Sequence, residues 1–497
     1  MPRYSEKLAY YHADELARKV VIMAIRSIHS VAVVSALAIA LASGACSSSD
    51  DQGGGGKGGS TGGNSGTGGG KGGSGGSGGT GGAPNGGQGG VAGGAPCDVT
   101  VSDTTYAAVS AAVAAATDGQ KICVPAGSSS WSPTLTIDKA ITLQAAGIGQ
   151  TIITDDYTQS YLIEITEAAT GSAKVAGFDF VVGAGPTNPS PACFIKVHYA
   201  DNGKPVLITA SKFSLVSETN ALCFETNRGV IWSNVFQGKV EGSNCLNNAG
   251  VLRHKAAGLA ASWTSPPTYG MDDTNGDQNL YFETNTATDV LEGVDVDDNA
   301  RIVFRYNNWT NSVILHHGAD TSGSGGRYSE IYNNTFVWDS SVKCASDLPT
   351  NVNAFIFNRG GSMQIHDNVI PDVSGQAWGD KSEISFIVES LRRNAGNYAC
   401  WTQGYPAPHQ AGWGYSTGAK QAGTSGVFQD LEPIYLWNNT GGGNYGSPGV
   451  LDYSPNECSA TADSATTYVQ KNREYYTNTP KPGYTPYTYP HPLTLTQ

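Results

Sequence analysis

The sequence predicts an all-β domain built as a solenoid of stacked coils, and three observations support this fold class. Charged residues make up only 14% of the chain, while Gly, Asn, Thr, Tyr and Val are abundant. Such a composition favours strands and turns over helices. A short unit centred on one asparagine recurs along the chain, and its closest recurrences are separated by about the length of one coil.

The recurring unit places an asparagine after a short apolar strand. The six shared asparagines are Asn234, Asn285, Asn308, Asn334, Asn368 and Asn439. Successive gaps are 51, 23, 26, 34 and 71 residues. Gaps of 23 and 26 suit one coil, 51 suits two, and the others suit coils that carry inserted loops. We expect the asparagines to stack at one turn and to hydrogen-bond along the solenoid axis.

One helix precedes the first coils. Residues 105–120 are rich in alanine and end at Asp-Gly, which is typical of a helix and its termination. Residues 121–127 and 134–153 follow with short alternating apolar runs broken by turn residues, which predict the first strands.

These features together resemble the right-handed parallel β-helix of the pectate-lyase-like superfamily, over about residues 100–445. The resemblance implies that the alanine-rich helix caps the first coil. The Pro- and Tyr-rich tail, residues 473–493, is similar to the C-terminal segment of many bacterial members and predicts an extended strap along the solenoid. A sandwich or a propeller is the alternative fold. The superfamily holds lyases, hydrolases, esterases and adhesins, so the resemblance leaves function open.

The N-terminal region is typical of an exported chain. Residues 1–46 end in a basic stretch and a short apolar run that predict a signal peptide, with Met23 as the alternative start. The end of this segment resembles a bacterial lipoprotein signal, which implies lipidation of Cys46. Residues 47–96 are Gly/Ser-rich and predict a disordered tether, followed by the β-helix domain at 97–497. We therefore expect a domain anchored by lipid to the bacterial outer membrane or cell surface.

Cysteine count and charge limit the remaining possibilities. The chain has nine cysteines, and eight remain if Cys46 carries lipid, which permits up to four disulfides. Cys97–Cys123 is the first pairing that we expect. The net charge of −13 becomes −15 without residues 1–45, which hold five Lys/Arg and three Asp/Glu. This balance argues against nucleic acid as a partner. We expect a monomer that acts on a polysaccharide.

Strand alternation sorts the side chains of the repeat between core and surface. The position three residues before the asparagine is apolar except at Arg305, where either the register slips or a buried arginine pairs with an acid such as Asp297. The neighbouring positions mix aromatic and polar residues and are predicted to face outward. The predicted substrate-binding residues are Glu283, Tyr306, Tyr332, His366 and Trp437. The alternative is that loops or the strap cover these side chains.

A cluster of carboxylates precedes Asn308. Asp295 and Asp297 share one face of a predicted strand, and Asp298 is adjacent. Closely spaced hard oxygen ligands suit Ca²⁺, although the spacing is not that of an EF-hand loop. The family resemblance implies that such a cation binds the carboxylate of a uronate. A solvated acidic turn is the alternative.

The segment 316–330 predicts a catalytic loop followed by a coil. The candidate bases are His316, His317, Arg327 and Lys381, of which His317 is preferred because histidine titrates near neutral pH. Arg301 and Arg327 are candidates to clamp a carboxylate, and Glu330 completes the predicted site. We expect a polysaccharide lyase that cleaves a uronate-containing polymer by β-elimination.

Two other functions stay open. A glycoside hydrolase needs two carboxylates about 5–10 Å apart, for which Glu283 with Glu330, or Asp297 with Glu330, are the candidate pairs. A non-catalytic glycan-binding or adhesin module would use the same aromatic face. The sequence contains no GxSxG motif or P-loop, and the adjacent histidines at 316 and 317 lack the spacing of a zinc motif.

Overall fold

The structure is a computed structural model of the 497-residue chain. The described residues are 96–156, 160–183, 193–216, 219–238, 246–256, 263, 267, 272–319, 325–339, 354–372, 383–392, 400–415, 421–422, 427–441, 448–451 and 464–495. The predicted signal peptide, the lipidation site Cys46, the tether and Lys381 lie outside these residues.

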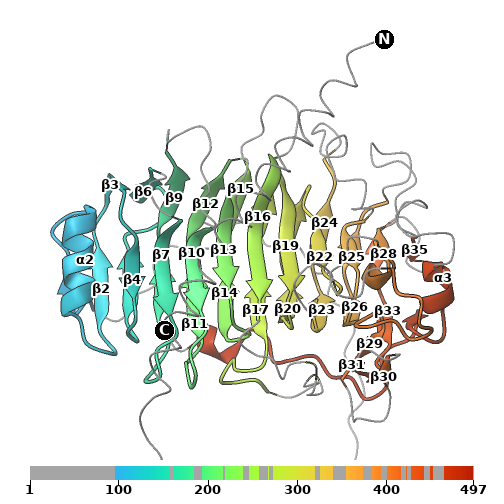
Figure 1. Cartoon of the computed structure of the whole chain (residues 1–497). Helices are drawn as coiled ribbons and strands as arrows, with labels where there is room; N and C mark the ends of the chain where they lie inside the picture. The colour runs from blue at the N-terminus through green and yellow to red at the C-terminus, as the bar shows by residue number, and fades with distance from the viewer. Residues whose placement is uncertain are drawn as a thin grey trace, which may run out of the picture. The chain divides into compact units, whose positions relative to one another are not determined.

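The chain winds into a right-handed parallel β-helix, as predicted, in which each coil contributes one strand to each of three long parallel sheets (Figure 1). From β4 onward the chain passes through sheet C, then sheet A, then sheet B, and repeats this order. Because a parallel sheet joins strands from successive coils, residues far apart in sequence become neighbours at about one strand spacing.

The strands of the three sheets, in their spatial order, are as follows. Sheet A contains β1 (Val99–Thr100), β2 (Lys121–Val124), β5 (Thr142–Ala145), β8 (Lys174–Ala176), β11 (Val206–Thr209), β14 (Gly229–Trp232), β17 (Leu280–Glu283), β20 (Arg301–Arg305), β23 (Tyr328–Tyr332), β26 (Ser362–His366), β33 (Ile434–Trp437) and β36 (Tyr475–Thr477). Sheet B contains β3 (Gly127–Trp131), β6 (Thr151–Asp155), β9 (Asp179–Val182), β12 (Lys212–Leu215), β15 (Val235–Gly238), β18 (Thr286–Thr288), β21 (Asn308–Thr310), β24 (Thr335–Val337), β27 (Val369–Ile370) and β34 (Thr440–Gly441). Sheet C contains β4 (Leu135–Ile137), β7 (Tyr161–Thr166), β10 (Cys193–His198), β13 (Asn220–Phe224), β16 (Leu246–Lys255), β19 (Val290–Asp297), β22 (Ile314–His316), β25 (Ile356–Asn358), β28 (Ile384–Phe386) and β35 (Gly449–Val450).

Shorter elements lie between and after the coils. Two antiparallel pairs join β29 (Trp413–Gly414) to β32 (Asp430–Leu431) and β30 (Gln421–Ala422) to β31 (Val427–Phe428). In the described ranges, the helical segments other than α2 are η2 (Glu389–Leu391), α3 (Ala465–Tyr468) and η4 (Pro492–Thr494). Among the described residues, no helix is both long and apolar enough to cross a membrane.

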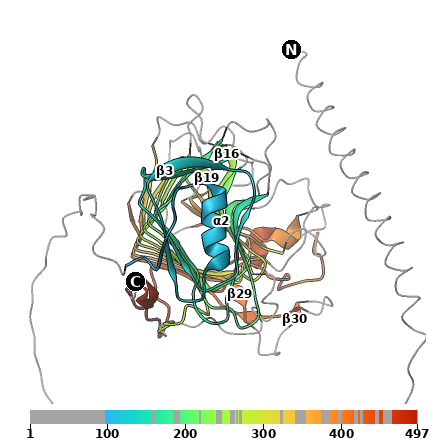
Figure 2. The same cartoon turned by 90° about the vertical axis from the view of Figure 1, so that its left-hand side faces the viewer.

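Helix α2 (Tyr106–Ala115) caps the first coil, as predicted, and Figure 2 shows it lying across the end of the solenoid. Its N-terminus is capped by Thr105, whose side chain accepts a hydrogen bond from the Ala108 amide. Its buried face, Val109 and Val113, seals the apolar interior that the first coil would otherwise expose to water.

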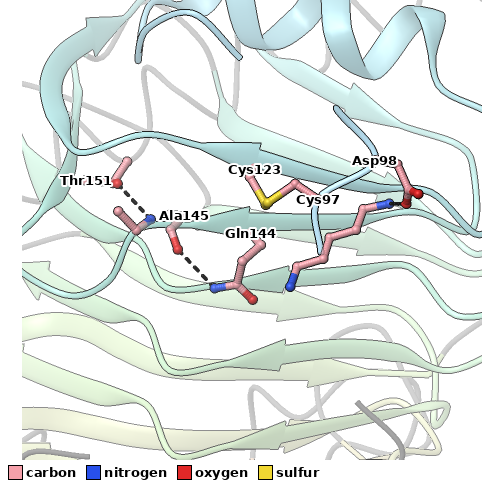
Figure 3. Close-up of a disulfide and its surroundings, with 8 residues drawn as sticks. Cys97, Asp98, Cys123, Gln144, Ala145 and Thr151 are labelled. Atoms are coloured by element: carbon pink, nitrogen blue, oxygen red, sulfur yellow. Dashed lines mark hydrogen bonds between the residues drawn. A yellow bond between two sulfur atoms is a disulfide. The ribbon is translucent and has the colours of Figure 1, made fainter. Parts of the chain in front are cut away.

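The predicted disulfide Cys97–Cys123 is confirmed and joins the start of the domain to β2 (Figure 3). A second disulfide joins Cys193 of β10 to Cys223 of β13. Cys400 is disulfide-bonded as well.

The asparagine ladder forms along the turn between sheets A and B. Five of the six predicted members are confirmed, and each amide accepts from or donates to its neighbour, as in Asn334 Nδ2 to Asn368 Oδ1 at 2.9 Å. The sixth prediction, Asn308, is wrong, because Asn307 takes the ladder position and donates to Asn334 Oδ1 at 3.0 Å. Asn308 lies one residue on, exposed at the start of β21.

The interior of the solenoid holds a second ladder, made of phenylalanines. Phe180, Phe213, Phe236, Phe282 and Phe304 stack in sequence with ring centroids 5.1 to 5.7 Å apart. All five are fully buried. Correcting the ladder to Asn307 places Phe304 in the core and turns Arg305 outward, so the register-slip alternative explains the exception in the apolar column.

The C-terminal strap is confirmed. After β36 pairs with β33, residues 478–495 run back along the outer face of sheet A and end with η4 near β14 (Figure 1). Tyr484 hydrogen-bonds to Glu330 of β23, Arg305 of β20 donates to the Tyr487 carbonyl oxygen, and the His491 amide donates to Glu283 of β17, so this segment is an integral layer of the fold.

Candidate functional site

The predicted site residues divide between two different sheets. Asp295, Asp297 and His317 belong to the outer face of sheet C and the turn that follows it. Arg301, Arg327 and Glu330 belong to sheet A or to the turn that precedes it. The structure therefore brings together each group of three but does not form one site from all six.

The outer face of sheet A is covered rather than open. Tyr332, His366 and Trp437 stack with centroid distances of 4.7 and 4.1 Å, and Tyr484 of the strap lies edge-on against His366 and Trp437. Each of the three stacked side chains is buried. The predicted open column for substrate is therefore wrong in this structure, and the alternative that the strap covers it is confirmed.

The other two members of the predicted column are also engaged. Glu283 accepts hydrogen bonds from Arg305 Nε at 2.8 Å and from the His491 amide at 3.0 Å. Tyr306 sits at the turn with a positive φ of 57° and stacks on Tyr489 of the strap at 3.6 Å. Arg305 is fully buried and pairs with an acid, as the second alternative predicted, but the acid is Glu283 and not Asp297.

Arg327 and Arg301 are packed inside the protein. Arg327 is fully buried, pairs with Glu432 at 2.7 Å and lies over the Trp263 ring at 5.4 Å. Burial and the nearby charge of Arg327 lower the pKa of Arg301, which is also buried. The prediction that both clamp a substrate on an open face is wrong, because both side chains are buried.

Glu330 is fully buried beneath the strap. Its two carboxyl oxygens form hydrogen bonds with the hydroxyls of Tyr328 and Tyr484, each at 2.8 Å. Burial raises the pKa of Glu330 to about 7. Because both Glu283 and Glu330 lie under the strap, the predicted hydrolase pair built from them has no access to a polymer here.

Sheet C carries a face of a different kind, which we call the charged face. Its members project outward from successive strands and are Glu164, Lys196, His198, Glu225, Arg253, Lys255, Glu292, Asp295, Asp297, His317 and Arg359. The side chains of Arg253 and Lys255 are 39% and 41% exposed, so cations are available on this face. The face combines five carboxylates with four Lys or Arg side chains and two histidines, so its charges nearly balance, whereas the whole chain carries a charge of −13.

His317 occupies the centre of the charged face. Its Nε2 atom lies 2.7 Å from Asp295 Oδ1 and also contacts Nη2 of Arg359. The imidazole is thus held between a carboxylate on β19 and a guanidinium that follows β25. Its partly exposed ring distinguishes it from His316, which points into the core and is fully buried.

A second layer holds Arg359 in place. Its Nη1 lies 3.3 Å from Oε2 of Glu389, and Glu389 accepts a hydrogen bond from Arg392 at 2.6 Å. Glu389 is buried in η2. The turn after β22 packs so closely here that a Cβ on Gly318 would lie 2.2 Å from the Arg359 carbonyl oxygen. Glycine at 318 therefore permits the approach that seats His317 beside Arg359.

Two carboxyls on this face are driven in opposite directions. Burial alone would raise the pKa of Asp295, but His317, Arg253 and Arg359 outweigh it and hold that pKa below its ordinary value. Burial and the charge of Asp295 raise the pKa of Glu292. Environments that separate the pKa values of two neighbouring acids are typical of sites that perform acid–base chemistry.

The predicted calcium ligands are paired with cations. Asp295 pairs with His317, and Asp297 accepts a hydrogen bond from Lys255 at 2.7 Å, with Asp298 3.7 Å from the same ammonium. Within the part of the chain that the structure describes, no group of three or more His, Cys, Asp or Glu residues is placed to hold a metal ion. These pairings do not test calcium binding, and calcium dependence stays a prediction.

Sequence reasoning missed Arg253, Lys255, Glu292 and Arg359. The recurring asparagines follow sheet A, so the repeat carries no information about which residues are neighbours in sheet C. The signal was present in the outward alternation of Arg253 and Lys255, which pair in register with Asp295 and Asp297 of the next coil.

These features define a right-handed parallel β-helix protein with a charged, partly exposed face on sheet C. No family model and no curated protein matches the chain. Among solved structures it is similar to a PL6 family alginate lyase, with 17% identity and a TM-score of 0.32, covering 55% of this chain and 35% of that one. The A-module of the Azotobacter vinelandii mannuronan C-5 epimerase is 15% identical with a TM-score of 0.32, covering 70% and 87%. A pectin methylesterase from Erwinia chrysanthemi is 11% identical with a TM-score of 0.27, covering 72% and 94%.

The chain thus spans about a third of the length of the alginate lyase. Likeness at these scores carries no functional argument. The fold rests on the strand order described above, and any function must be argued from the side chains of the site.

Proposed function

We propose that the protein is a polysaccharide lyase that cleaves a uronate-containing polymer by β-elimination on the charged face of sheet C. The observation that supports this most strongly is the placement of His317 between Asp295 and Arg359, beside the exposed cations Arg253 and Lys255. β-Elimination needs a base for a carbon acid and cations to stabilise the charge that develops on the adjacent carboxylate.

In the proposed reaction Arg253 and Lys255 bind the uronate carboxylate. Their positive charges stabilise the enolate-like charge that forms there when the C5 proton leaves. His317 removes that proton, and the C5–H electron pair becomes the C4=C5 double bond. The bond between C4 and the glycosidic oxygen breaks, and this oxygen takes a proton from Glu292. One product carries the unsaturated uronate at its non-reducing end, and the other carries a new reducing end.

The partners of His317 have distinct proposed roles. Asp295, held ionised by its cationic neighbours, stabilises the imidazolium that forms when His317 accepts the proton. The positive charge of Arg359 acts against protonation of His317 and so offsets part of the effect of Asp295. Burial and Asp295 raise the pKa of Glu292, which extends upward the pH range in which this acid can donate a proton.

A second candidate function is supported by the same carboxyls. Glu292 and Asp295 lie on the same strand, β19, and their pKa values are shifted in opposite directions, so they are the candidate acid and base of an inverting glycoside hydrolase. This pair replaces the predicted pair of Glu283 and Glu330. A non-catalytic glycan-binding module is the third outcome.

The test follows two signals with purified protein and a panel of acidic and neutral polysaccharides. Ultraviolet absorbance from unsaturated uronate supports the lyase, reducing ends without absorbance support the hydrolase, and binding without either signal supports the module. His317→Asn should lower absorbance turnover by about 100-fold or more, the usual contribution of general base catalysis. If Glu330→Gln abolishes turnover while His317→Asn does not, the reaction belongs to sheet A and the proposal fails.

We also propose export and lipid anchoring through Cys46. Mass spectrometry of the mature N-terminus and detergent partition of a Cys46→Ala variant test this. A Cys46→Ala variant that stays in the membrane fraction would contradict the anchor.

Loss of turnover on chelation, restored by Ca²⁺, would support the predicted metal.

A further inference from the structure

A second cluster lies on the charged face, toward the N-terminal end of sheet C. It consists of Tyr161 on β7, Lys196 and His198 on β10, and Glu225 just after β13. Glu164 of β7 completes it. The mechanism proposed above uses none of these residues.

The cluster is tightly interconnected and partly exposed. Lys196 donates a hydrogen bond to Oε1 of Glu225, and Nδ1 of His198 lies 3.1 Å from Oε2 of the same carboxylate. The Lys196 ammonium also lies over the Tyr161 ring, 5.8 Å from its centroid. The side chains of His198 and Glu225 are 35% and 42% exposed, whereas that of Lys196 is 11% exposed, so a ligand would reach the cluster at His198 and Glu225.

Stability does not explain such a cluster well. Ion pairs that contact solvent contribute about 0–1 kcal/mol. Although burial opposes ionisation, Lys196 and His198 outweigh it and hold the pKa of Glu225 below its ordinary value. The carboxylate is therefore ready to accept hydrogen bonds.

A disulfide links the two strands that carry most of the cluster. Cys193 begins β10, and Cys223 of β13 is in register with Lys196. The bond therefore ties together the two strands that position Lys196, His198 and Glu225. Fixed side chains lose less conformational entropy when a ligand binds.

The cluster is aligned with the proposed reaction centre. Lys196, Cys223, Arg253 and Asp295 occupy one register row of sheet C. Three strand steps separate β10 from β19, which is about 14 Å at the usual spacing. A sugar chain lying along the solenoid axis would meet both clusters.

We propose that Tyr161, Lys196, His198 and Glu225 form a distal subsite that binds an acidic sugar unit several positions from the bond that is cleaved. This inference rests on the proposed function, because it takes the polymer to lie along the charged face. The Lys196 ammonium pairs with a sugar carboxylate, the Tyr161 ring contacts a sugar face, and Glu225 accepts from hydroxyl groups.

The test measures binding and not turnover. Affinity gel electrophoresis first identifies which uronate homopolymer retards the full mature protein most strongly. Length-fractionated oligomers of that polymer are then titrated calorimetrically against wild type and Lys196→Met, which keeps the aliphatic stem. We expect about tenfold weaker binding of long oligomers, since a charge-assisted hydrogen bond is lost, and unchanged binding of oligomers too short to span both clusters.

Lys212→Met on β12 of sheet B is the matched control and should bind both lengths as wild type does. Equal loss of affinity for short and long oligomers, or no loss for either, would overturn the subsite. If the wild-type protein forms elimination product but Lys196→Met binds all oligomers as tightly as wild type, the subsite is refuted and the lyase is not. Length-dependent binding without elimination product would refute the lyase and leave the subsite standing.

Discussion

Glu330 is a carboxylic acid buried beneath the C-terminal strap, and replacing it with glutamine tests how the strap is held. The Tyr484 hydroxyl contacts both Glu330 Oε2 at 2.8 Å and His366 Nε2 at 2.9 Å, but it has one proton to donate. Burial lowers the pKa of His366 and so favours the neutral ring, in which Nδ1 donates to Asp367 and Nε2 accepts the Tyr484 proton. Glu330 must then carry a proton of its own and donate it to Tyr484.

The magnitude follows from the pKa of Glu330. Burial raises this pKa from 4.5 to about 7, and each unit corresponds to about 1.4 kcal/mol, so the group is linked to about 3 kcal/mol of stability. The folded state holds the proton more tightly than the unfolded state. The contribution is therefore complete below about pH 4.5 and is lost as the pH rises through about 7.

The assay is denaturant unfolding of the mature protein between pH 4.5 and pH 8. Wild type should lose about 3 kcal/mol over this range through Glu330, whereas Glu330→Gln should lose that much less. Glutamine keeps the shape, can donate to Tyr484 and can accept from Tyr328. Glu164→Gln, at a glutamate that is one-third exposed on sheet C, serves as the control. If Glu330→Gln and wild type show the same pH dependence, Glu330 does not hold a proton in the folded state and the reasoning is refuted.

Three further predictions concern the ladder, a disulfide and the reaction. Asn307→Ala should cost about 2–4 kcal/mol of unfolding free energy, because it leaves buried amide groups of its neighbours without hydrogen bonds. The control Asn308→Ala, at an exposed residue, should cost less than about 0.5 kcal/mol, and equal costs would contradict the ladder assignment. Replacing Cys193 and Cys223 by alanine should cost about 3–4 kcal/mol, from the closure of a 30-residue loop, and an unchanged denaturation midpoint would refute this. Glu292→Gln should remove the alkaline limb of the pH–rate profile, because glutamine has no proton to lose as the pH rises, and a profile identical to wild type would exclude Glu292 as the acid.

The register error at Asn308 shows the limit of a local pattern. The sequence there is Tyr306-Asn307-Asn308, so either asparagine satisfies the repeat. Asn307 takes the ladder position because it hydrogen-bonds to the coils on both sides. Tyr306, the residue before it, then has a positive φ of 57°, a conformation that is uncommon for tyrosine. A shift of one residue exchanges the core and surface faces of a strand, which is why Arg305 violated the predicted column.

The site was harder to predict than the fold, because it depends on which faces are covered. The aromatic column with Tyr332 and His366 has the composition of a sugar-binding face, yet residues more than a hundred positions later in the chain pack onto it. Conversely, Asp295 and His317 were predicted correctly as neighbours. Their partner Arg359 comes from the following coil, 42 residues after His317.

The sequence by itself determined the solenoid, its cap helix, its ladder turn and its strap, since alternation, turn residues and recurrence are local properties that repeat in every coil. Only the tertiary structure decided that sheet A is sealed and that sheet C presents the exposed charges. Coverage and ion pairing arise between segments distant in sequence, and no periodicity along the chain records which of two outward faces another segment will bury.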